Sequence, residues 1–487
     1  MQKGPVLNAV RAALLGRVDI ASIVWFRIVF GAVMVWEVWR YFDHGWIRRF
    51  YIEPQFLFKY HGFGWVERLP GDWMIVHFAA LGVLAACIAT GLWYRAAASL
   101  FCLGFAYVFL VAQARYLNHF YLVTLLSFLL VFVPAGRAFS LDALRRPAIR
   151  RNTAPGWSLW LLRFQIGIVY FYGGVAKLNG DWLHGEPMRM WLLERTDLPL
   201  LGGLFTHEPV PYLFALGGLL LDLLVVPLLL WRPTRVAACL ALVLFHLLNS
   251  QLFQIGIFPW LMLLATPIFL PPDLPRRAAA SARDRFRTGG AHRPGAASSA
   301  NRPPAVRVPA PVAAARERLT LGLIAVYVAV QLLVPLRHHL YPGNVAWTEE
   351  GHRFSWRMKL RDKEAYAAFV VTDPVSGKTW PVDPLRYLTP MQLEEMSSRP
   401  GMIVQFSHFL EDQGRNEGYA DVEVRAYVTA SLNGRIPQLL VDPTIDLTRE
   451  RRSLGPVRWI LPLADPLERA AAAVAAPALD GHSPRSP

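Results

Sequence analysis

The sequence contains few cysteines and none of the short motifs that mark the common classes of soluble enzyme. Its 487 residues include 3 cysteines, and all three, Cys87, Cys102 and Cys239, lie in apolar stretches without CxxC spacing. This pattern excludes a disulfide framework and a cysteine-based metal cluster. A glycine-rich phosphate loop, HExxH and GxSxG are also absent, so motifs do not place the chain among P-loop enzymes, zinc proteases or serine hydrolases.

Hydrophobic residues, by contrast, are abundant. They make up 54% of the chain and the mean hydropathy is positive, as is typical of integral membrane proteins. The net charge of +15 would favour nucleic-acid binding in a soluble protein, but the arginines concentrate in a few loops beside apolar segments. Cytoplasmic loops of membrane proteins show this bias. We therefore expect a lipid bilayer as partner and no nucleic acid.

Nine apolar stretches predict membrane spans. Several are shorter than the roughly 20 residues that a bilayer requires, notably the pair that flanks "NSQLF", which we interpret as half-helices. The predicted spans cover residues 20–39, 73–92, 96–112, 120–133, 157–176, 212–230, 236–248, 255–270 and 321–334.

Arginine-rich loops predict the orientation of these spans. With the N-terminus in the cytoplasm, the arginines at 95, at 137–151 and at 232 and 235 all fall inside, together with the segment 271–318. That segment is rich in Arg, Ala, Pro and Ser, which favours a disordered basic cytoplasmic linker. An odd number of spans leaves the C-terminal part outside. We expect a multi-pass protein of the cell inner membrane with an extracytoplasmic C-terminal domain.

The C-terminal part has a different pattern. The runs "AYAAFVVTD", "MIVQFSHFL" and "ADVEVRAYVTA" alternate with a period of two, and "DPVSGKT" and "LNGR" are turn signals. The predicted fold class is a polytopic α-helical transmembrane bundle of about nine spans followed by a small extracytoplasmic β-rich domain. The predicted organisation is a helical domain at 1–270, the linker at 271–318, a final helix at 319–336, the β-rich domain at 337–464 and a disordered tail at 465–487.

A lysine stands where a membrane helix should still be apolar. Lys177 follows the span 157–176, with Gly173 and Gly174 at i−4 and i−3 and Asp181 at i+4, spacings that share one helical face. One interpretation is an interfacial lysine that pairs with Asp181. The other is a buried amine that acts as a base, with glycines that let a large group approach the backbone. The spacing fits both.

Two more polar groups stand out at the same predicted outer side. Asn118 and His119 begin a span, where they fit a helix cap and a boundary residue, although the histidine could instead donate to a developing oxyanion. His246, Asn249 and Ser250 share a face of another span, where polar side chains often link helices. Because the charge count places these residues and the lysine at one leaflet, they are candidates for one pocket.

Four stretches resemble the vitamin K-dependent γ-glutamyl carboxylase family, including its bacterial members within the wider HTTM-domain group. They are "NHFYL" at 118–122, "GGVAKLNGDWLHGEPM" at 173–188, "FHLLNSQLFQIGIFPWLML" at 245–263 and "WTEEGHRFSW" at 347–356. The second and third motifs match over many consecutive residues. The resemblance covers roughly 20–356 without the linker.

The resemblance implies a specific chemistry. A base at Lys177 deprotonates reduced vitamin K (phylloquinol or menaquinol); reaction with oxygen then gives a strong base that removes the γ-proton of a glutamate, and carbon dioxide adds while the quinone leaves as its epoxide. No metal is implied. The partners would be the isoprenoid quinone and a glutamate-containing peptide or protein. The implied residues are Lys177 and His119 as catalytic, Asn118, Gly173, Gly174, His246 and Asn249 at the cofactor, and Trp347, Phe354 and Trp356 at the substrate.

The sequence also departs from the family pattern. The animal enzymes carry a second lysine where this chain has Ala176, and they have a longer C-terminal portion that recognises a propeptide. Two alternatives therefore stay open. One is a quinol oxygenase or epoxidase that does not carboxylate protein, and the other is a non-enzymatic transporter or lipid-binding protein, since intramembrane Lys, His and Asn also mark transport paths.

Overall fold

A computed structural model describes residues 5–253, 255–287 and 310–464, and these form two compact units. The described residues of the first unit come from 5–175, 218–337 and 354–356. Those of the second unit come from 176–217, 338–353 and 357–464. The segment that follows the fifth predicted span therefore groups with the C-terminal part of the chain.

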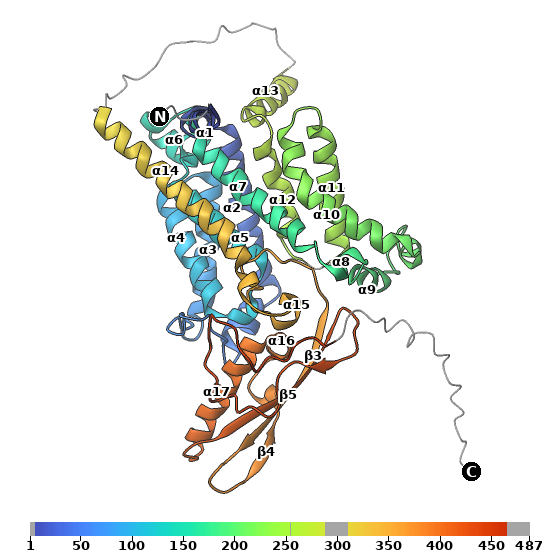
Figure 1. Cartoon of the computed structure of the whole chain (residues 1–487). Helices are drawn as coiled ribbons and strands as arrows, with labels where there is room; N and C mark the ends of the chain where they lie inside the picture. The colour runs from blue at the N-terminus through green and yellow to red at the C-terminus, as the bar shows by residue number, and fades with distance from the viewer. Residues whose placement is uncertain (1–4, 254, 288–309, 465–487) are drawn as a thin grey trace, which may run out of the picture. The chain divides into compact units, whose positions relative to one another are not determined.

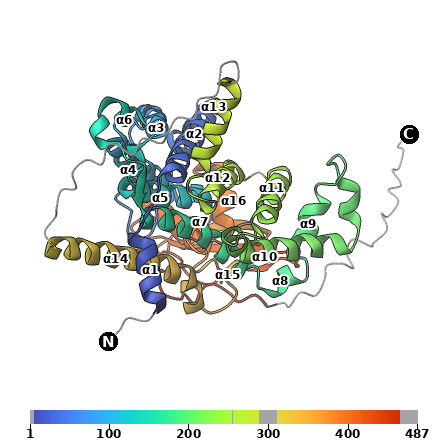
Figure 2. The ribbon, with the colours of Figure 1, turned by 90° about the horizontal axis from the view of Figure 1, so that it is seen from above.

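Long apolar helices dominate the first unit. Helix α2 (Ala21–Asp43) packs on α3 (Trp73–Thr90), α3 on α4 (Tyr94–Val111) and α4 on α5 (Asn118–Phe132). Figures 1 and 2 show the four grouped together in both views. Seven helices among the described residues are long and apolar enough to cross a membrane. They are α2 (Ala21–Asp43), α3 (Trp73–Thr90), α4 (Tyr94–Val111), α7 (Gly156–Ala176), α10 (Pro209–Leu230), α11 (Arg235–Leu252) and α14 (Ala310–Leu333).

Two shorter apolar helices complete the set, so each of the nine predicted stretches corresponds to a helix. They are α5 and α12 (Phe258–Ala265), the latter continued by a 3-10 turn, Thr266–Phe269. The interpretation of both stretches around "NSQLF" as half-helices was wrong for the first, because α11 runs on to Leu252. Ser250 bonds back to the carbonyl of Leu247 at 2.7 Å, which lets a polar residue stay inside the helix.

Short elements of the first unit connect the long helices. Helix α1 (Pro5–Leu15) precedes β1 (Arg17–Asp19), which pairs antiparallel with β2 (Thr153–Pro155) just before α7. Helix α6 (Leu141–Arg145) is capped by Ser140, whose side chain accepts from the Ala143 amide.

The segment predicted as a disordered linker is partly helical. Helix α13 spans Leu274–Arg287, and α14 begins at Ala310, before the final helix predicted at 319–336. Alanine and arginine both favour the helix, and in α13 this preference prevails over the Pro- and Ser-rich composition of the segment from which disorder was predicted. Residues 288–309 of the predicted linker and the predicted disordered tail at 465–487 lie outside the described residues.

The second unit holds a four-stranded antiparallel sheet, which confirms the small C-terminal sheet domain. The strand order is β4-β3-β5-β6, and the pairing of β3 with β5 runs from Lys363 opposite Leu432 to Thr372 opposite Glu423. Alternate residues of β5 are buried, as period-two patterning predicts. The strands are β3 (Lys363–Thr372), β4 (Thr379–Val382), β5 (Glu423–Leu432) and β6 (Gln438–Leu439).

One of the three predicted strands was wrong. The run "MIVQFSHFL" lies in α17 (Pro400–Asn416), which packs with α16 (Pro390–Ser397) against the sheet, as Figure 1 shows. Its buried residues Met402, Ile403, Phe406 and Leu410 also satisfy the helical period, and a proline at the first helical position favours a helix start. The domain is therefore a sheet covered by helices.

Candidate functional site

Two of the predicted histidines come together in the first unit. His119 lies in the first turn of α5 and His246 is fully buried in α11. The ring of Phe258, at the start of α12, is 6.5 Å from the His119 ring and 6.1 Å from the His246 ring. Both imidazoles therefore border the same aromatic side chain.

A hydrogen bond between helices fixes His246. Its Nε2 lies 2.8 Å from the hydroxyl of Tyr170 in α7, the interhelical link that polar residues in spans commonly make. Its Nδ1 has no hydrogen-bond partner among the residues that the structure describes. Asn249, one turn further along α11, is half-buried. A ring nitrogen thus stays available to a ligand.

Charged residues that the sequence analysis did not select lie beside His119. Gly256 has φ +59°, which strains any other residue, and a Cβ there would lie 3.3 Å from Arg40 Nη1 and 3.8 Å from His119 Nε2, so this backbone lies close to both side chains. Arg40 pairs with Glu37 at 2.7 Å. Arg115 also interacts electrostatically with His119. The signal was available, since Glu37 and Arg40 stand in or next to an otherwise apolar span.

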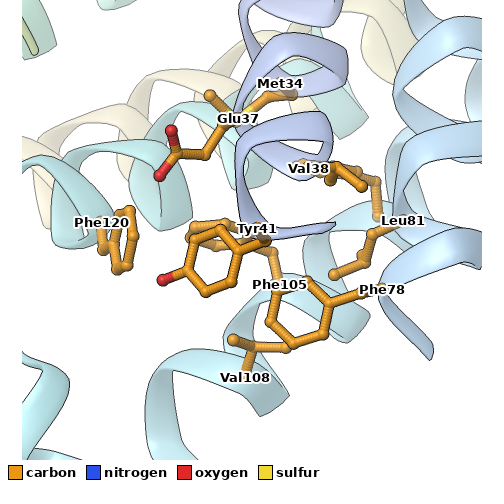
Figure 3. Close-up of a pocket in the computed structure, with 10 residues that line it drawn as sticks. Met34, Glu37, Val38, Tyr41, Phe78, Leu81, Phe105, Val108 and Phe120 are labelled. Carbon is orange, nitrogen blue, oxygen red and sulfur yellow. The ribbon is translucent and has the colours of Figure 1, made fainter. Parts of the chain in front are cut away.

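A small cavity lies beside Glu37 (Figure 3). Its volume is about 20 Å³, room for about one water molecule. Glu37 and Tyr41 line it together with apolar side chains, among them Phe78, Phe105 and Phe120, and its surface is almost wholly apolar. A cavity of this size does not admit a naphthoquinone ring, so we do not assign it to the cofactor.

Hydrogen bonds join Asn118 to the predicted substrate segment. The amide of Phe354 donates to the hydroxyl of Tyr116 at 2.7 Å, and that hydroxyl donates to Asn118 Oδ1 at 3.0 Å. Tyr121 stacks on Trp356 with ring centroids 4.8 Å apart and meets Phe354 edge-on at 5.0 Å. Asn118 starts α5 and Leu117 is its N-cap, so the capping role considered for Asn118 was wrong.

The two glycines of the lysine motif allow close packing of helices. A Cβ on Gly174 would lie 2.7 Å from side-chain atoms of Leu223, and one on Gly173 would lie 3.2 Å from Asp222 Oδ2, both in α10. The large group that approaches this backbone is therefore a neighbouring helix. Helix packing accounts for both glycines, and their assignment to the cofactor stays a prediction.

Lys177 belongs to the second unit. Helix α7 ends at Ala176, and a new helix, α8 (Gly180–Leu183), begins after Asn179, whose side chain accepts from the Trp182 amide. The predicted continuous face from Gly173 to Asp181 was therefore wrong, because Asn179 is extended and interrupts the helix. Lys177 is only 7% exposed, and its Nζ lies 5.3 Å from the ring centroid of Trp182.

Asp181 is bound to the sheet. Both of its oxygens accept from the Arg435 guanidinium at 2.8 Å, and Asn433 Nδ2 donates to Oδ2 at 2.6 Å. Burial alone would raise the pKa of Asp181, but the hydrogen bonds from Arg435 and Asn433 outweigh it and hold this pKa below its usual value. Arg435 and Asn433 therefore occupy both oxygens of Asp181, the carboxylate that one interpretation of the sequence had paired with Lys177.

The predicted substrate residue Trp347 is a core residue of the second unit. Its indole Nε1 donates to the Leu461 carbonyl at 2.8 Å, and its own carbonyl accepts from Lys363 Nζ at 2.5 Å. Phe354 and Trp356 belong to the first unit instead. The structure thus groups Asn118, His119, His246, Phe354 and Trp356 in one unit and Lys177 and Trp347 in the other.

A buried charge cluster surrounds Glu349, next to the helix α15 (Val345–Thr348). Arg361 lies 2.6 Å from Glu349 Oε1, and His352 lies 3.6 Å from Oε2. Burial alone would raise the pKa of Glu349, yet the surrounding cations hold it well below its usual value. Burial lowers the pKa of Lys363 to about 7 and that of His352 to about 3, with Glu349 opposing both shifts.

Family comparisons match almost the whole described chain. The HTTM domain matches residues 16–274, and the vitamin K-dependent gamma-carboxylase lumenal domain matches residues 316–466. No solved structure matches the chain. The residues between the two matches, 275–315, include all of α13 but its first residue and the start of α14.

Proposed function

Because the chain belongs to the vitamin K-dependent gamma-carboxylase family, we propose that it carboxylates glutamate side chains with reduced vitamin K, oxygen and carbon dioxide. The observation that carries this proposal is Lys177, a lysine 7% exposed against Trp182 within the motif that resembles the family's catalytic segment. Its membrane helices and its lumenal-type domain support a membrane enzyme that acts on a peptide or protein.

The residues around Phe258 fit a naphthoquinone. Phe258 offers an aromatic surface, and His246 Nδ1 is a buried polar atom without a hydrogen-bond partner among the described residues. A flat apolar ring with two oxygens matches such a site. When bound, reduced vitamin K (phylloquinol or menaquinol) supplies the electrons with which oxygen is turned into a strong base, and it leaves as the epoxide. We propose that His246, with Asn118 and Asn249, holds this group.

Lys177 has the surroundings of a base in this reaction. A base must exchange its proton with the bound substrate rather than with bulk water, and Lys177 is only 7% exposed. After the proton is accepted, the face of the Trp182 ring stabilises the resulting ammonium. Trp182 is itself 2% exposed, so water is kept from this side of the amine.

His119 is proposed to stabilise negative charge, with Arg40 nearby. We expect His119→Ala to lower kcat for epoxide formation by about 10²–10³-fold, the usual effect of removing a preorganised donor. His77→Ala is the matched control. His77 lies in an apolar helix, as His119 does, but its ring nitrogen bonds to the backbone carbonyl of Gly104 at 3.0 Å. Equal rates for both variants would remove His119 from the mechanism.

The orientation of the chain is a further part of the proposal, with the N-terminus cytoplasmic and the C-terminal domain outside. The match to a lumenal domain and the arginine-rich loops support it. A cysteine introduced at exposed Val375 should react with an impermeant maleimide in intact spheroplasts, whereas one at exposed Arg146 should react only after lysis. The opposite pattern would invert the topology.

Formation of the epoxide separates an enzyme from a binding or transport protein. Purified chain in nanodiscs, supplied with reduced vitamin K and oxygen, should form epoxide over many turnovers. Binding of reduced vitamin K without any product would instead favour the transporter or lipid-binding alternative.

A further inference from the structure

The segment that carries Lys177 is held by two neighbouring side chains of α8 that make different contacts. The ring of Trp182 lies 5.3 Å from Lys177 Nζ, and its indole donates to the carbonyl of Ala215 at 2.8 Å. Asp181 is bound by Arg435 and Asn433 of the turn that follows β5. Since α8 has only four residues, fixing Asp181 also fixes Trp182.

The Asp181–Arg435 contact has the features of a structural clamp. Arg435 binds both carboxylate oxygens, and its side chain is 6% exposed while that of Asp181 is 14% exposed. Bidentate pairs of this kind fix orientation as well as distance. Removing one partner would leave the other charge buried without compensation.

Asn433 extends the clamp to the start of β3. Its Oδ1 accepts from the Asp362 amide at 2.8 Å, while its Nδ2 donates to Asp181. Asp362 in turn accepts from the indole of Trp191 in α9 (Met188–Leu193) at 2.8 Å. Asn433 has φ +53° and Gly434 has φ +76°, which this tight turn requires.

We propose that Arg435 and Asn433 are positioning residues for Lys177: through Asp181 and Trp182 they hold its amine at the place where it acts. This inference rests on the proposed function for the role of Lys177 as the base, whereas the contacts of Asp181 with Arg435 and Asn433 are a property of the second unit. It assigns to the turn after β5 a role in the reaction of a lysine more than 250 residues away in sequence.

The direct test is the reactivity of Lys177 toward an amine-acylating reagent, measured by mass spectrometry on the full-length protein in detergent. In Arg435→Ala and in the isosteric Asp181→Asn, we expect Lys177 to be acylated about tenfold faster, because local opening becomes easier. Lys378 is the internal control, since it is exposed and lies on Trp380 at 5.4 Å. Unchanged acylation of Lys177 in both variants overturns the inference, whatever their activity.

Kinetics give a second and independent readout. We expect Arg435→Ala to lower kcat for epoxide by about 10- to 100-fold, as misplacement of a catalytic group does. The matched control is Arg425→Ala, whose ion pair with Glu423 on the same sheet is 40% exposed at the arginine. An added primary amine should restore activity to Lys177→Ala. The rescued rate of the double variant Lys177→Ala/Arg435→Ala should equal that of Lys177→Ala, because a free amine does not depend on the clamp for its position.

The outcomes separate this inference from the proposed function. Wild-type protein that forms no epoxide but shows the expected acylation pattern would refute the enzyme and leave the clamp standing. Active wild-type protein with an Arg435→Ala rate equal to that of Arg425→Ala would refute the positioning role alone. A lower amine-rescued rate in the double variant Lys177→Ala/Arg435→Ala than in Lys177→Ala would indicate a general structural effect and count against the positioning role.

Discussion

Lys177→Ala should form epoxide about 10²–10⁴-fold more slowly than the wild type, the range expected for loss of a general base. Lys177→Arg should be equally slow, because a guanidinium does not release its proton at usable pH. Both substitutions remove a side chain that is 7% exposed and lies on Trp182, so folding is checked by thermal unfolding of each variant in the same detergent.

Chemical rescue decides whether the lost group is an amine that acts on a proton. Small primary amines added to Lys177→Ala should restore part of the rate, with greater restoration as pH rises and more of the amine is uncharged. Lys378→Ala is the control, because Lys378 also lies on a tryptophan ring but is exposed. A Lys177→Ala protein that folds and forms epoxide at the wild-type rate would contradict the assignment of the base.

Glu349→Ala should produce the largest loss of stability. Glu349 is buried beside Arg361 and His352, and Lys363 also interacts with it. Its removal leaves Arg361 and Lys363 without this carboxylate, whereas Arg399 keeps its ion pair with Glu395. Breaking a buried ion pair in this way costs about 3–5 kcal/mol of the free energy of unfolding. Hydrogen exchange of the β3 and β5 amides in the full-length protein should report it. The matched control is Glu423→Ala, which removes a surface pair worth about 0–1 kcal/mol.

The pH dependence of this loss has a defined sign. The folded pKa of Glu349 is depressed, so its stabilisation is present above the unfolded value of about 4.3 and is lost only as pH falls through the lower folded value. Lys363, with a folded pKa of about 7, is largely neutral at pH 9. The wild type then loses the attraction between Glu349 and Lys363 that Glu349→Ala already lacks, so the gap in stability between the two should narrow from pH 6 to pH 9. A gap that widens would contradict this account of the cluster.

The sequence predicted the membrane helices well because burial in lipid requires long apolar runs, and nothing else in the chain resembles them. It failed where one pattern serves two structures. Residues 402–410 alternate with period two and also place Met402, Phe406 and Leu410 at helical spacing, and the preceding proline favoured the helix. The prediction of disorder for the linker was wrong at α13 for a different reason. It relied on composition and on the lack of hydrophobic periodicity, and neither prevents a helix from forming.

The residues of the candidate site stay predictions. Lys177, His119 and His246 were selected because an ionisable or polar side chain in an apolar run is costly and therefore conspicuous. Arg435 and Glu349 were missed, since charged residues in a soluble-type domain are ordinary and only the fold shows that they are buried. The predicted pairing of Lys177 with Asp181 assumed a helix that in fact ends at Ala176. Local spacing could not reveal that Asp181 binds a turn more than 250 residues away.

The most direct test of the proposed function follows two products in the same reaction. Purified protein in nanodiscs would receive reduced vitamin K, oxygen, labelled bicarbonate and a short glutamate peptide, and both epoxide and peptide-bound label would be measured over time. We predict that both products form, that the label is released as γ-carboxyglutamate on hydrolysis, and that Lys177→Ala loses both together. Epoxide without label in the peptide would contradict protein carboxylation and leave a quinol oxygenase, and a Lys177→Ala protein that retains either product would contradict the mechanism.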